Sequence, residues 1–330
     1  MKTRGSTIDD TIGVKGMEYR PLGKTGMKVS KLSFGASSIG SVFRPTDEAE
    51  SIRTVHAAIA EGINYLDVSP YYGDTKAEAV LGKAISQLSR DQFYLSTKAG
   101  RYGMDQFDYS GARIEASLEE SLRRLNTDYV DILFLHDIEF VQPDIILEEA
   151  IPTLNRLKQQ GKIRFTGICG LPLSMFEQLL PQVEVDAIIS YCHYSLNDTS
   201  LTQLLPLVND RGVGLVNASP LSMGLLSARG TPDWHPASQE LKSKCQQAAQ
   251  LLADRGEDIA KLAVQFSTSN EQIPTTLVST ANPDNIIRNA RWTEEPIDQE
   301  LLNAVREVLR PIQNKTWVSG VPRYNANVEA

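Results

Sequence analysis

Eight short apolar runs, each typical of a buried β-strand, alternate along this chain with segments of helical periodicity. The predicted strands span residues 32–35, 64–67, 93–98, 129–135, 163–168, 187–190, 214–217 and 276–279. The predicted helices span residues 47–61, 76–86, 111–125, 145–160, 174–180, 201–208, 259–267 and 284–290. Strands and helices in regular alternation predict an α/β protein with a parallel sheet.

The alternation by itself fits both a closed barrel and an open, doubly wound sheet. An open sheet that binds a dinucleotide usually carries a glycine-rich fingerprint after its first strand, and the stretch after residue 35 has none. The 330 residues are enough for one large barrel, and the 41% of hydrophobic residues are enough for its core. The open form is therefore disfavoured.

Three of the predicted strands end on side chains that can exchange or stabilise a proton. Asp67, Lys98 and His136 close the second, third and fourth strands, and Tyr72 follows Asp67 by little more than a turn. Because the carboxyl ends of neighbouring barrel strands meet at one face, we expect these four side chains to converge. Such a set suits acid–base chemistry. Tyr71 competes with Tyr72 for this role, and the residues alone do not choose between them.

Composition excludes several other classes of function. The net charge of −8 argues against a nucleic-acid surface, and no apolar run approaches the roughly 18 residues of a membrane span. Cys169, Cys192 and Cys245 are widely spaced, which predicts reduced thiols in a cytoplasmic protein rather than disulfides or a zinc site. His193 and His235 also lack the spacing of metal ligands, so no metal is expected.

Nine short motifs carry a resemblance to a known family. They are FGASS (34–38), GSVF (40–43), SPYYG (69–73), GRY (100–102), HDIEF (136–140), GLPL (170–173), SYCHY (190–194), ASPL (218–221) and WHPAS (234–238). In these motifs the chain resembles the aldo-keto reductases, and most closely their L-galactose dehydrogenase branch. The resemblance implies a (β/α)8 TIM barrel over residues 17–320, with an N-terminal hairpin plugging the bottom and long loops over the C-terminal face. Residues 1–16 are then a flexible extension, residues 321–330 a C-terminal tail, and the protein a monomer.

The resemblance also implies a catalytic tetrad of Asp67, Tyr72, Lys98 and His136, and it favours Tyr72 over Tyr71. A free tyrosine titrates near ~10, and the Lys98 ammonium is expected to lower the pKa of Tyr72. Asp67 is expected to pair with Lys98, because an unpaired buried ammonium is costly. His136 is then expected to donate to, or orient, the substrate oxygen.

A nicotinamide cofactor follows from the same resemblance. The expected contacts, from nicotinamide to adenine, are Gly35, Asp67, Ser190, Tyr191, Ser219, Pro220, Leu221, Gly224, Leu225, Ser279, Asn285 and Asn289. Many family members have Ser-Asn where this chain has Cys169 and Gly170, so one contact to the carboxamide must differ. Many also stack a tyrosine on the nicotinamide, at the position of Ala218.

The adenosine end bears on the choice between NAD and NADP. NADP-preferring members often place a lysine and an arginine where this chain has Ser279 and Asn285. Arginine binds a phosphate through two parallel hydrogen bonds, so the lack of these cations favours NAD. Arg288, beside Asn289, keeps NADP open.

Long loops are expected to hold the substrate, a small sugar or aldehyde. The expected substrate contacts are Phe43, Tyr72, Tyr102, His136, Trp234 and His235. The resemblance predicts NAD-dependent oxidation of an L-galactose-like aldose at C1 to its lactone. The alternatives are a broad NADPH-dependent aldehyde or ketone reductase and a non-catalytic regulatory subunit, and the intact tetrad argues against the last.

Overall fold

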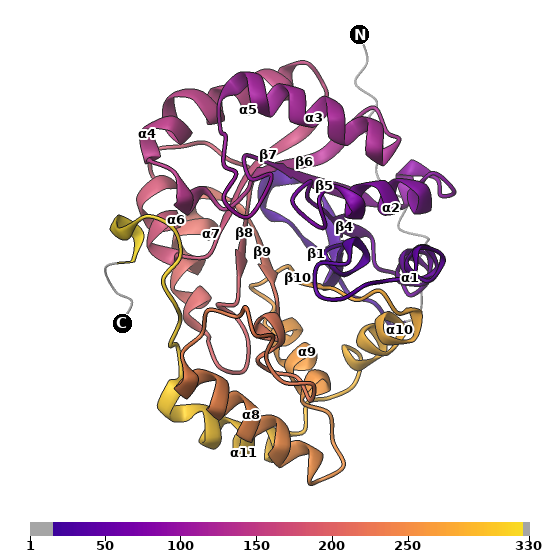
Figure 1. Ribbon diagram of the computed structural model, residues 1–330, viewed down its shortest axis with the longest axis vertical. Helices are drawn as coiled ribbons and strands as arrows, with labels where there is room; N and C mark the ends of the chain where they lie inside the picture. Colours follow the sequence, from indigo (N-terminus) through magenta and orange to yellow (C-terminus); the bar gives the residue numbers. More distant parts are fainter. Residues whose placement is uncertain (1–15, 326–330) are drawn as a thin grey trace.

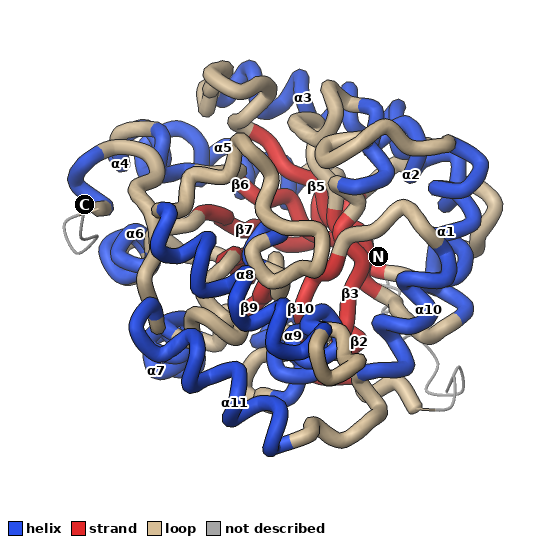
Figure 2. The backbone as a smooth tube through the Cα atoms, turned by 60° about the horizontal axis from the view of Figure 1, so that its bottom comes forward, coloured by secondary structure: helices blue, strands red, loops and turns tan. Residues whose placement is uncertain are grey.

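Eight parallel strands close into a barrel at the centre of the molecule, in the order β10-β3-β4-β5-β6-β7-β8-β9 (Figures 1 and 2). The structure is a computed structural model and describes residues 16–325. The barrel strands are β3 (Leu32–Gly35), β4 (Tyr65–Asp67), β5 (Tyr94–Ala99), β6 (Val130–Leu135), β7 (Ile163–Gly170), β8 (Ala187–Tyr191), β9 (Gly214–Ala218) and β10 (Thr275–Val278). All eight predicted strands are present, and the predicted barrel is confirmed.

Helices surround the strands (Figure 2). They are α1 (Glu48–Ala60), α2 (Lys76–Ile85), α3 (Gly111–Leu125), α4 (Pro143–Ile145), α5 (Ile151–Gln159), α6 (Leu173–Leu179), α7 (Leu205–Arg211), α8 (Gln239–Ala253), α9 (Ile259–Ser269), α10 (Pro283–Trp292) and α11 (Gln299–Leu309). The single helix predicted over 145–160 is divided by a π-helical turn at Ile146–Ala150. The sequence analysis did not predict α8 and α11, which pack against each other outside the barrel (Figure 1).

Helix α3 illustrates how local sequence specifies these elements. The side chain of Ser110 accepts a hydrogen bond from the backbone N–H of Arg113 and so caps the first turn. At the other end, Asn126 takes a left-handed conformation, which ends the helix. Leu118, Leu122 and Leu125 recur at helical spacing and are buried. Full burial of such a side chain stabilises the fold by about 1.5–3 kcal/mol.

An antiparallel hairpin, β1 (Tyr19–Pro21) with β2 (Lys28–Ser30), precedes the barrel. Its buried Leu22, Met27 and Val29 belong to the same apolar cluster as barrel-interior residues such as Tyr65 and Phe134. The backbone N–H of Lys24 donates to the carbonyl of Gly212, just before β9 begins. The hairpin therefore closes the N-terminal end of the barrel, as predicted.

The last described residues cross the opposite end. We call residues 313–325 the C-terminal strap. The N–H of Val321 donates to the carbonyl of Glu139 over 2.8 Å, and the hydroxyl of Ser174 donates to the carbonyl of Tyr324 over 2.5 Å. In Figure 1 the strap runs from α11 past the barrel to α6. Residues 1–15 and 326–330, most of the two predicted terminal segments, lie outside the described residues.

No helix between residues 16 and 325 is long and apolar enough to cross a membrane.

Candidate active site

A buried ion pair lies at the C-terminal end of the barrel. The carboxylate of Asp67, the last residue of β4, accepts a 2.5 Å hydrogen bond from the ammonium of Lys98 on β5. The parallel register sets Asp67 opposite Ser96, whose hydroxyl donates to the other carboxylate oxygen over 2.7 Å. Lys98 also donates to the carbonyl of Val68 and is only 1% exposed. Burial alone would lower the pKa of Lys98, but the neighbouring anionic groups, Asp67 foremost, raise it overall.

Tyr72 lies beside this pair, with the Lys98 nitrogen 4.8 Å from the centre of its ring. Burial raises the pKa of Tyr72, Lys98 lowers it, and the net result lies above the usual value for a tyrosine. The expectation that Lys98 brings the pKa of Tyr72 below that value is therefore wrong for this structure. The physical reason is that desolvation outweighs an ammonium whose charge is already partly neutralised by Asp67. Tyr72 is a phenol at neutral pH.

His136 follows β6 and completes the group. Its backbone N–H donates to the carbonyl of Ala99, which extends the pairing of β6 with β5 by one residue. Its ring lies edge-on to that of Tyr72, with 5.7 Å between the ring centres. Burial, opposed by Asp137, lowers the pKa of His136 to about 3. The imidazole is consequently neutral at physiological pH. Tyr109 donates to the carbonyls of His136 and Asp137 and fixes the backbone there.

Arg101 lies beside this group, where it contacts Asp137 and Tyr71. Its guanidinium donates to the Asp137 carboxylate over 2.6 Å and to the hydroxyl of Tyr71 over 3.1 Å. The same guanidinium stacks on the ring of Tyr71, 4.1 Å from its centre. The rings of both tyrosines lie edge-on to that of His136, but Tyr71 is bound to an arginine, whereas Tyr72 faces Lys98.

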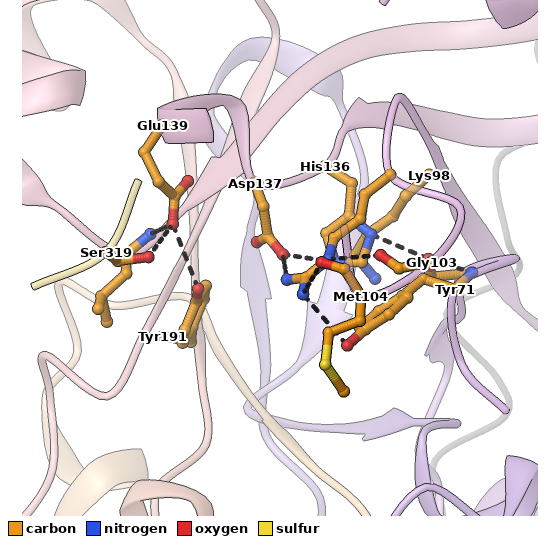
Figure 3. A network of polar contacts seen from close by, with 12 residues as sticks. Tyr71, Lys98, Gly103, Met104, His136, Asp137, Glu139, Tyr191 and Ser319 are labelled. Carbon is orange, nitrogen blue, oxygen red and sulfur yellow. Dashed lines mark hydrogen bonds and ion pairs between the residues drawn. The ribbon is translucent and has the colours of Figure 1, made fainter. Parts of the chain in front are cut away.

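Glu139 forms a second polar group beneath the C-terminal strap (Figure 3). Its Oε1 accepts from the backbone N–H of Leu171, from the hydroxyl of Ser319 and, over 3.4 Å, from the hydroxyl of Tyr191. Its Oε2 has no hydrogen-bond partner in the described part of the chain. Burial, reinforced by Asp137, raises the pKa of Glu139 to about 8.

The predicted substrate residues in the long loops differ in exposure. Phe43 and Trp234 lie at the exposed rim of these loops, whereas His235 lies inside them. Phe43 and Trp234 stack with 6.1 Å between ring centres and are 46% and 54% exposed. His235 is buried, where its two ring nitrogens contact the backbone of Ser222 and Ala237. These two contacts indicate that His235 organises the loop to which it belongs.

Tyr102 lies apart from the tetrad. Its ring stacks on Arg113 of α3, with 4.1 Å from the guanidinium carbon to the ring centre. Its hydroxyl accepts from the backbone N–H of Gly100. The structure therefore turns Tyr102 towards the outer helix, and Arg101 is the residue of this loop that contacts Asp137 and Tyr71.

The predicted cofactor residues lie at or just after the C-terminal ends of β3, β4, β8, β9 and β10, and on α10. Ser190 is buried at the end of β8, and its hydroxyl has no partner among residues 16–325, as expected of a group reserved for a ligand. After β9, Ser219, Ser222, Met223 and Gly224 all have positive φ, and the N–H groups of Ser222, Gly224 and Leu225 each donate to the carbonyl three residues earlier, which forms tight turns. The unpartnered Ser190 hydroxyl fits the carboxamide of a nicotinamide dinucleotide.

The predicted adenosine end of the cofactor site is lined by hydroxyl and amide groups. The hydroxyl of Ser279 lies within 2.9 Å of the hydroxyls of both Ser37 and Ser38, and all three side chains are at or near the surface. Arg288 donates to the side chain of Asn285 on the first turn of α10. Asn289 lies one residue further along α10 and is half-buried.

One cluster has the residue types of a metal site. Donor atoms of His136, Asp137 and Cys169 lie within 4.8 Å of one another. Asp137 is already paired with Arg101, and burial raises the pKa of the Cys169 thiol well above its usual value. A protonated thiol and an occupied carboxylate are poor ligands, so the expectation of no metal remains a prediction.

Ser69, Arg101, Asp137 and Glu139 lie in the family motifs, but no role in the site was predicted for them. Their only signal in the sequence is a position within three residues of a tetrad member. Their contacts depend on loop conformations, such as the left-handed φ of Asp137, that strand periodicity does not report.

Comparison with known proteins agrees with this geometry. The aldo/keto reductase family model matches residues 31–310. L-galactose dehydrogenase of Arabidopsis thaliana is 47% identical over 92% of this chain and 98% of its own length. D-arabinose 1-dehydrogenase of Saccharomyces cerevisiae is 36% identical over 73% of this chain and 76% of its own length.

A solved aldo-keto reductase from Bacillus halodurans, in its holo form, superposes with a TM-score of 0.72 at 27% identity, over 93% of this chain and 99% of the other. The family match spans most of the chain, and the barrel, the buried ion pair and the neighbouring phenol and imidazole all lie within it. This chain is an oxidoreductase that belongs to the aldo/keto reductase family.

Proposed function

We propose that this protein oxidises an L-galactose-like aldose at C1 to the lactone, with NAD as hydride acceptor and Tyr72 as the acid–base group. The observation that carries the chemistry is Tyr72 placed beside the buried Asp67–Lys98 pair and edge-on to neutral His136. The substrate class is supported by the likeness to two dehydrogenases whose names specify L-galactose and D-arabinose.

The reaction removes a hydride and a proton from the sugar. The C1–H bond breaks, its electron pair leaves with the hydrogen, and the C1–O bond becomes the carbonyl of the lactone. A nicotinamide cofactor, when bound, would supply the hydride acceptor, and the residues at the ends of β3, β8 and β9 would hold it. The hydroxyl proton goes to the oxygen of Tyr72, so in this direction Tyr72 must first be ionised.

Lys98 assists at the oxygen of Tyr72, and His136 assists at the substrate oxygen. The Lys98 ammonium, 4.8 Å from the Tyr72 ring centre, stabilises the phenolate by its charge. Asp67 keeps that ammonium charged and in place, because a lone cation at this depth is unfavourable. The neutral imidazole of His136 donates a hydrogen bond to the substrate oxygen, where negative charge develops as the proton leaves.

The cofactor preference follows from charge at the adenosine end. The residues there are Ser279 and Asn285, which hydrogen-bond hydroxyl groups well but do not neutralise a phosphate. Arg288 is the nearby cation, and its guanidinium already donates to Asn285. We therefore propose NAD as the preferred cofactor.

A second candidate function is NADPH-dependent reduction of aldehydes or ketones. Two features support it: the raised pKa of Tyr72 keeps it protonated at neutral pH, ready to act as an acid, and Arg288 is a cation on α10 beside Asn285, at the predicted adenosine end. The same four residues would then run the reaction in reverse.

The two adjacent tyrosines offer a matched test of the acid–base assignment. Tyr72→Phe should lower kcat for aldose oxidation by at least about 100-fold, the usual contribution of a general acid–base group. Tyr71→Phe should keep most of the turnover, since Tyr71 contacts Arg101. Cofactor binding, followed by protein fluorescence, should be unchanged in both variants. Retained turnover in Tyr72→Phe would remove Tyr72 from the mechanism.

A further inference from the structure

Ser69 is a buried serine in the turn between β4 and Tyr72, and its side chain faces the catalytic histidine. Its Oγ lies 3.0 Å from Nδ1 of His136. The same Oγ accepts a hydrogen bond from the backbone N–H of Tyr71 over 3.1 Å. Ser69 is 0% exposed, so both contacts are made away from water. Within residues 16–325 these are the hydrogen bonds that the hydroxyl makes.

The hydrogens of this group can be counted. The N–H of Tyr71 can only donate, so it occupies a lone pair of Ser69 Oγ. The hydroxyl hydrogen needs an acceptor, because a buried O–H without one is costly. Nδ1 of His136 is the acceptor within reach. Nδ1 therefore carries no hydrogen, and the neutral imidazole must carry its hydrogen on Nε2.

Nε2 of His136 makes no hydrogen bond to any residue between 16 and 325. Its nearest acidic oxygen, Oδ2 of Asp137, lies 3.6 Å away, beyond a normal hydrogen bond. That oxygen already accepts a 2.6 Å hydrogen bond from Arg101. Tyr109 donates to the backbone carbonyl of His136, and the His136 ring lies edge-on to that of Tyr72. An Nε2–H in this position is available to a substrate oxygen.

We propose that Ser69 is a positioning residue that fixes the Nε2–H tautomer of His136, so that His136 donates to the oxygen at C1 of the sugar. The inference rests on the proposed function only in naming that oxygen; the tautomer itself is a property of the protein without substrate. A free histidine populates both neutral tautomers, and the wrong one would present a lone pair to the developing oxyanion. Ser69 prevents the wrong tautomer through its hydrogen bond to Nδ1, on the side of the ring away from Nε2.

The tautomer can be read directly by nitrogen NMR of protein labelled with ¹⁵N-histidine. The chain has four histidines, and His136→Asn identifies the His136 signals by their loss. We expect a protonated Nε2 and an unprotonated Nδ1 for His136 in the wild-type protein. Ser69→Ala should give a mixture of tautomers. Ser69→Thr, which keeps the hydroxyl, should restore the wild-type pattern.

Turnover should follow the tautomer. Ser69→Ala should lower kcat about 10- to 100-fold, whereas KM and the dissociation constant of the cofactor stay within about twofold. The control is Ser51→Ala, which removes another fully buried serine hydroxyl, on the outer helix α1, and should leave kcat and the His136 signals unchanged. If Ser69→Ala fails to fold, the wild-type spectrum and Ser69→Thr still decide the question.

Two results would overturn the inference: a wild-type His136 protonated on Nδ1, or an unchanged tautomer together with an unchanged kcat in Ser69→Ala. Failure of the proposed function looks different. If no aldose is oxidised, the NMR measurement retains its meaning, and kcat is taken from aldehyde reduction instead. An altered tautomer in Ser69→Ala would then support the role of Ser69 while the sugar assignment is lost.

Discussion

Lys98 and Asp67 are buried together at the centre of the active face, where neither charge is favourable alone. Removing one partner of such a pair costs about 3–5 kcal/mol, because the other charge stays buried and uncompensated. The pair therefore adds little net stability to the fold. Its main effect is to hold a positive charge in a fixed position next to Tyr72. Burial works against that charge, since it raises the pKa of Tyr72 and keeps the phenol protonated.

The pH dependence of oxidation follows from these shifts. Oxidation needs ionised Tyr72, whose pKa lies above its ordinary value, so kcat/KM for the sugar should rise with pH throughout the range from about 6 to ~10. His136 has a pKa of about 3 and stays neutral, so no break is expected near ~6.5, the usual value for histidine. Initial rates at saturating cofactor measure this profile.

A plateau below about pH 8, or an inflection near ~6.5, would contradict that account of Tyr72 and His136. Tyr71→Phe serves as the control, because loss of a phenol that only binds Arg101 should leave the shape of the profile unchanged.

At the scale of elements, the C-terminal strap is joined to the barrel through Glu139. Ser319 donates to the Glu139 carboxylate, and Val321 donates to the Glu139 carbonyl. The carboxyl group is fully buried, and its pKa is raised from 4.5 to about 8, so the folded protein holds a proton there that the unfolded chain releases. Folding stability attributable to this group is present at low pH and falls as the pH rises from about 4.5 towards about 8.

Replacing Glu139 with glutamine removes that proton linkage and keeps an oxygen acceptor for Leu171 and Ser319. The melting temperature of Glu139→Gln relative to wild type should therefore increase by several degrees between pH 5 and pH 8, since each pH unit of linkage is worth up to about 1.4 kcal/mol. Glu148→Gln, which changes an exposed carboxylate nearby, should show no such trend. A difference between Glu139→Gln and wild type that is constant with pH would show that Glu139 is ionised in the folded protein.

The elements that sequence reasoning found are those whose signal is local. The predicted strand at 32–35 and the predicted helix at 111–125 coincide with β3 and α3, because an apolar run between turns and a capped amphipathic helix specify themselves. Helices α8 and α11 were missed because they stand outside the strand–helix alternation; each buries a narrow apolar stripe against the other or against α9.

The same distinction holds for the site. Asp67, Lys98 and His136 were found because each ends a strand, and parallel strands end at one face. Ser69, Arg101 and Glu139 were not assigned, because their contacts join loops whose conformations no periodicity encodes. The direction of the pKa shift of Tyr72 was also mispredicted, since it depends on the depth of burial.

For the molecule as a whole, the barrel is a scaffold that is closed by the hairpin below and covered by loops and the C-terminal strap above. The family includes sugar dehydrogenases as well as aldo-keto reductases, so the fold does not choose between these functions. The choice lies in the rim, where Phe43 and Trp234 are exposed, and at the adenosine end, where Ser279 and Asn285 lie.

The measurement that tests the central claim most directly is an initial-rate screen of aldoses with NAD and with NADP, following the reduced nicotinamide by absorbance and identifying the sugar product. We expect oxidation of L-galactose or its 6-deoxy relative to the lactone, with kcat/KM at least about tenfold higher for NAD than for NADP, and loss of this activity in Tyr72→Phe. Activity confined to the reduction of aldehydes with NADPH would contradict the proposed sugar oxidation and the proposed cofactor, and would establish the reductase in its place.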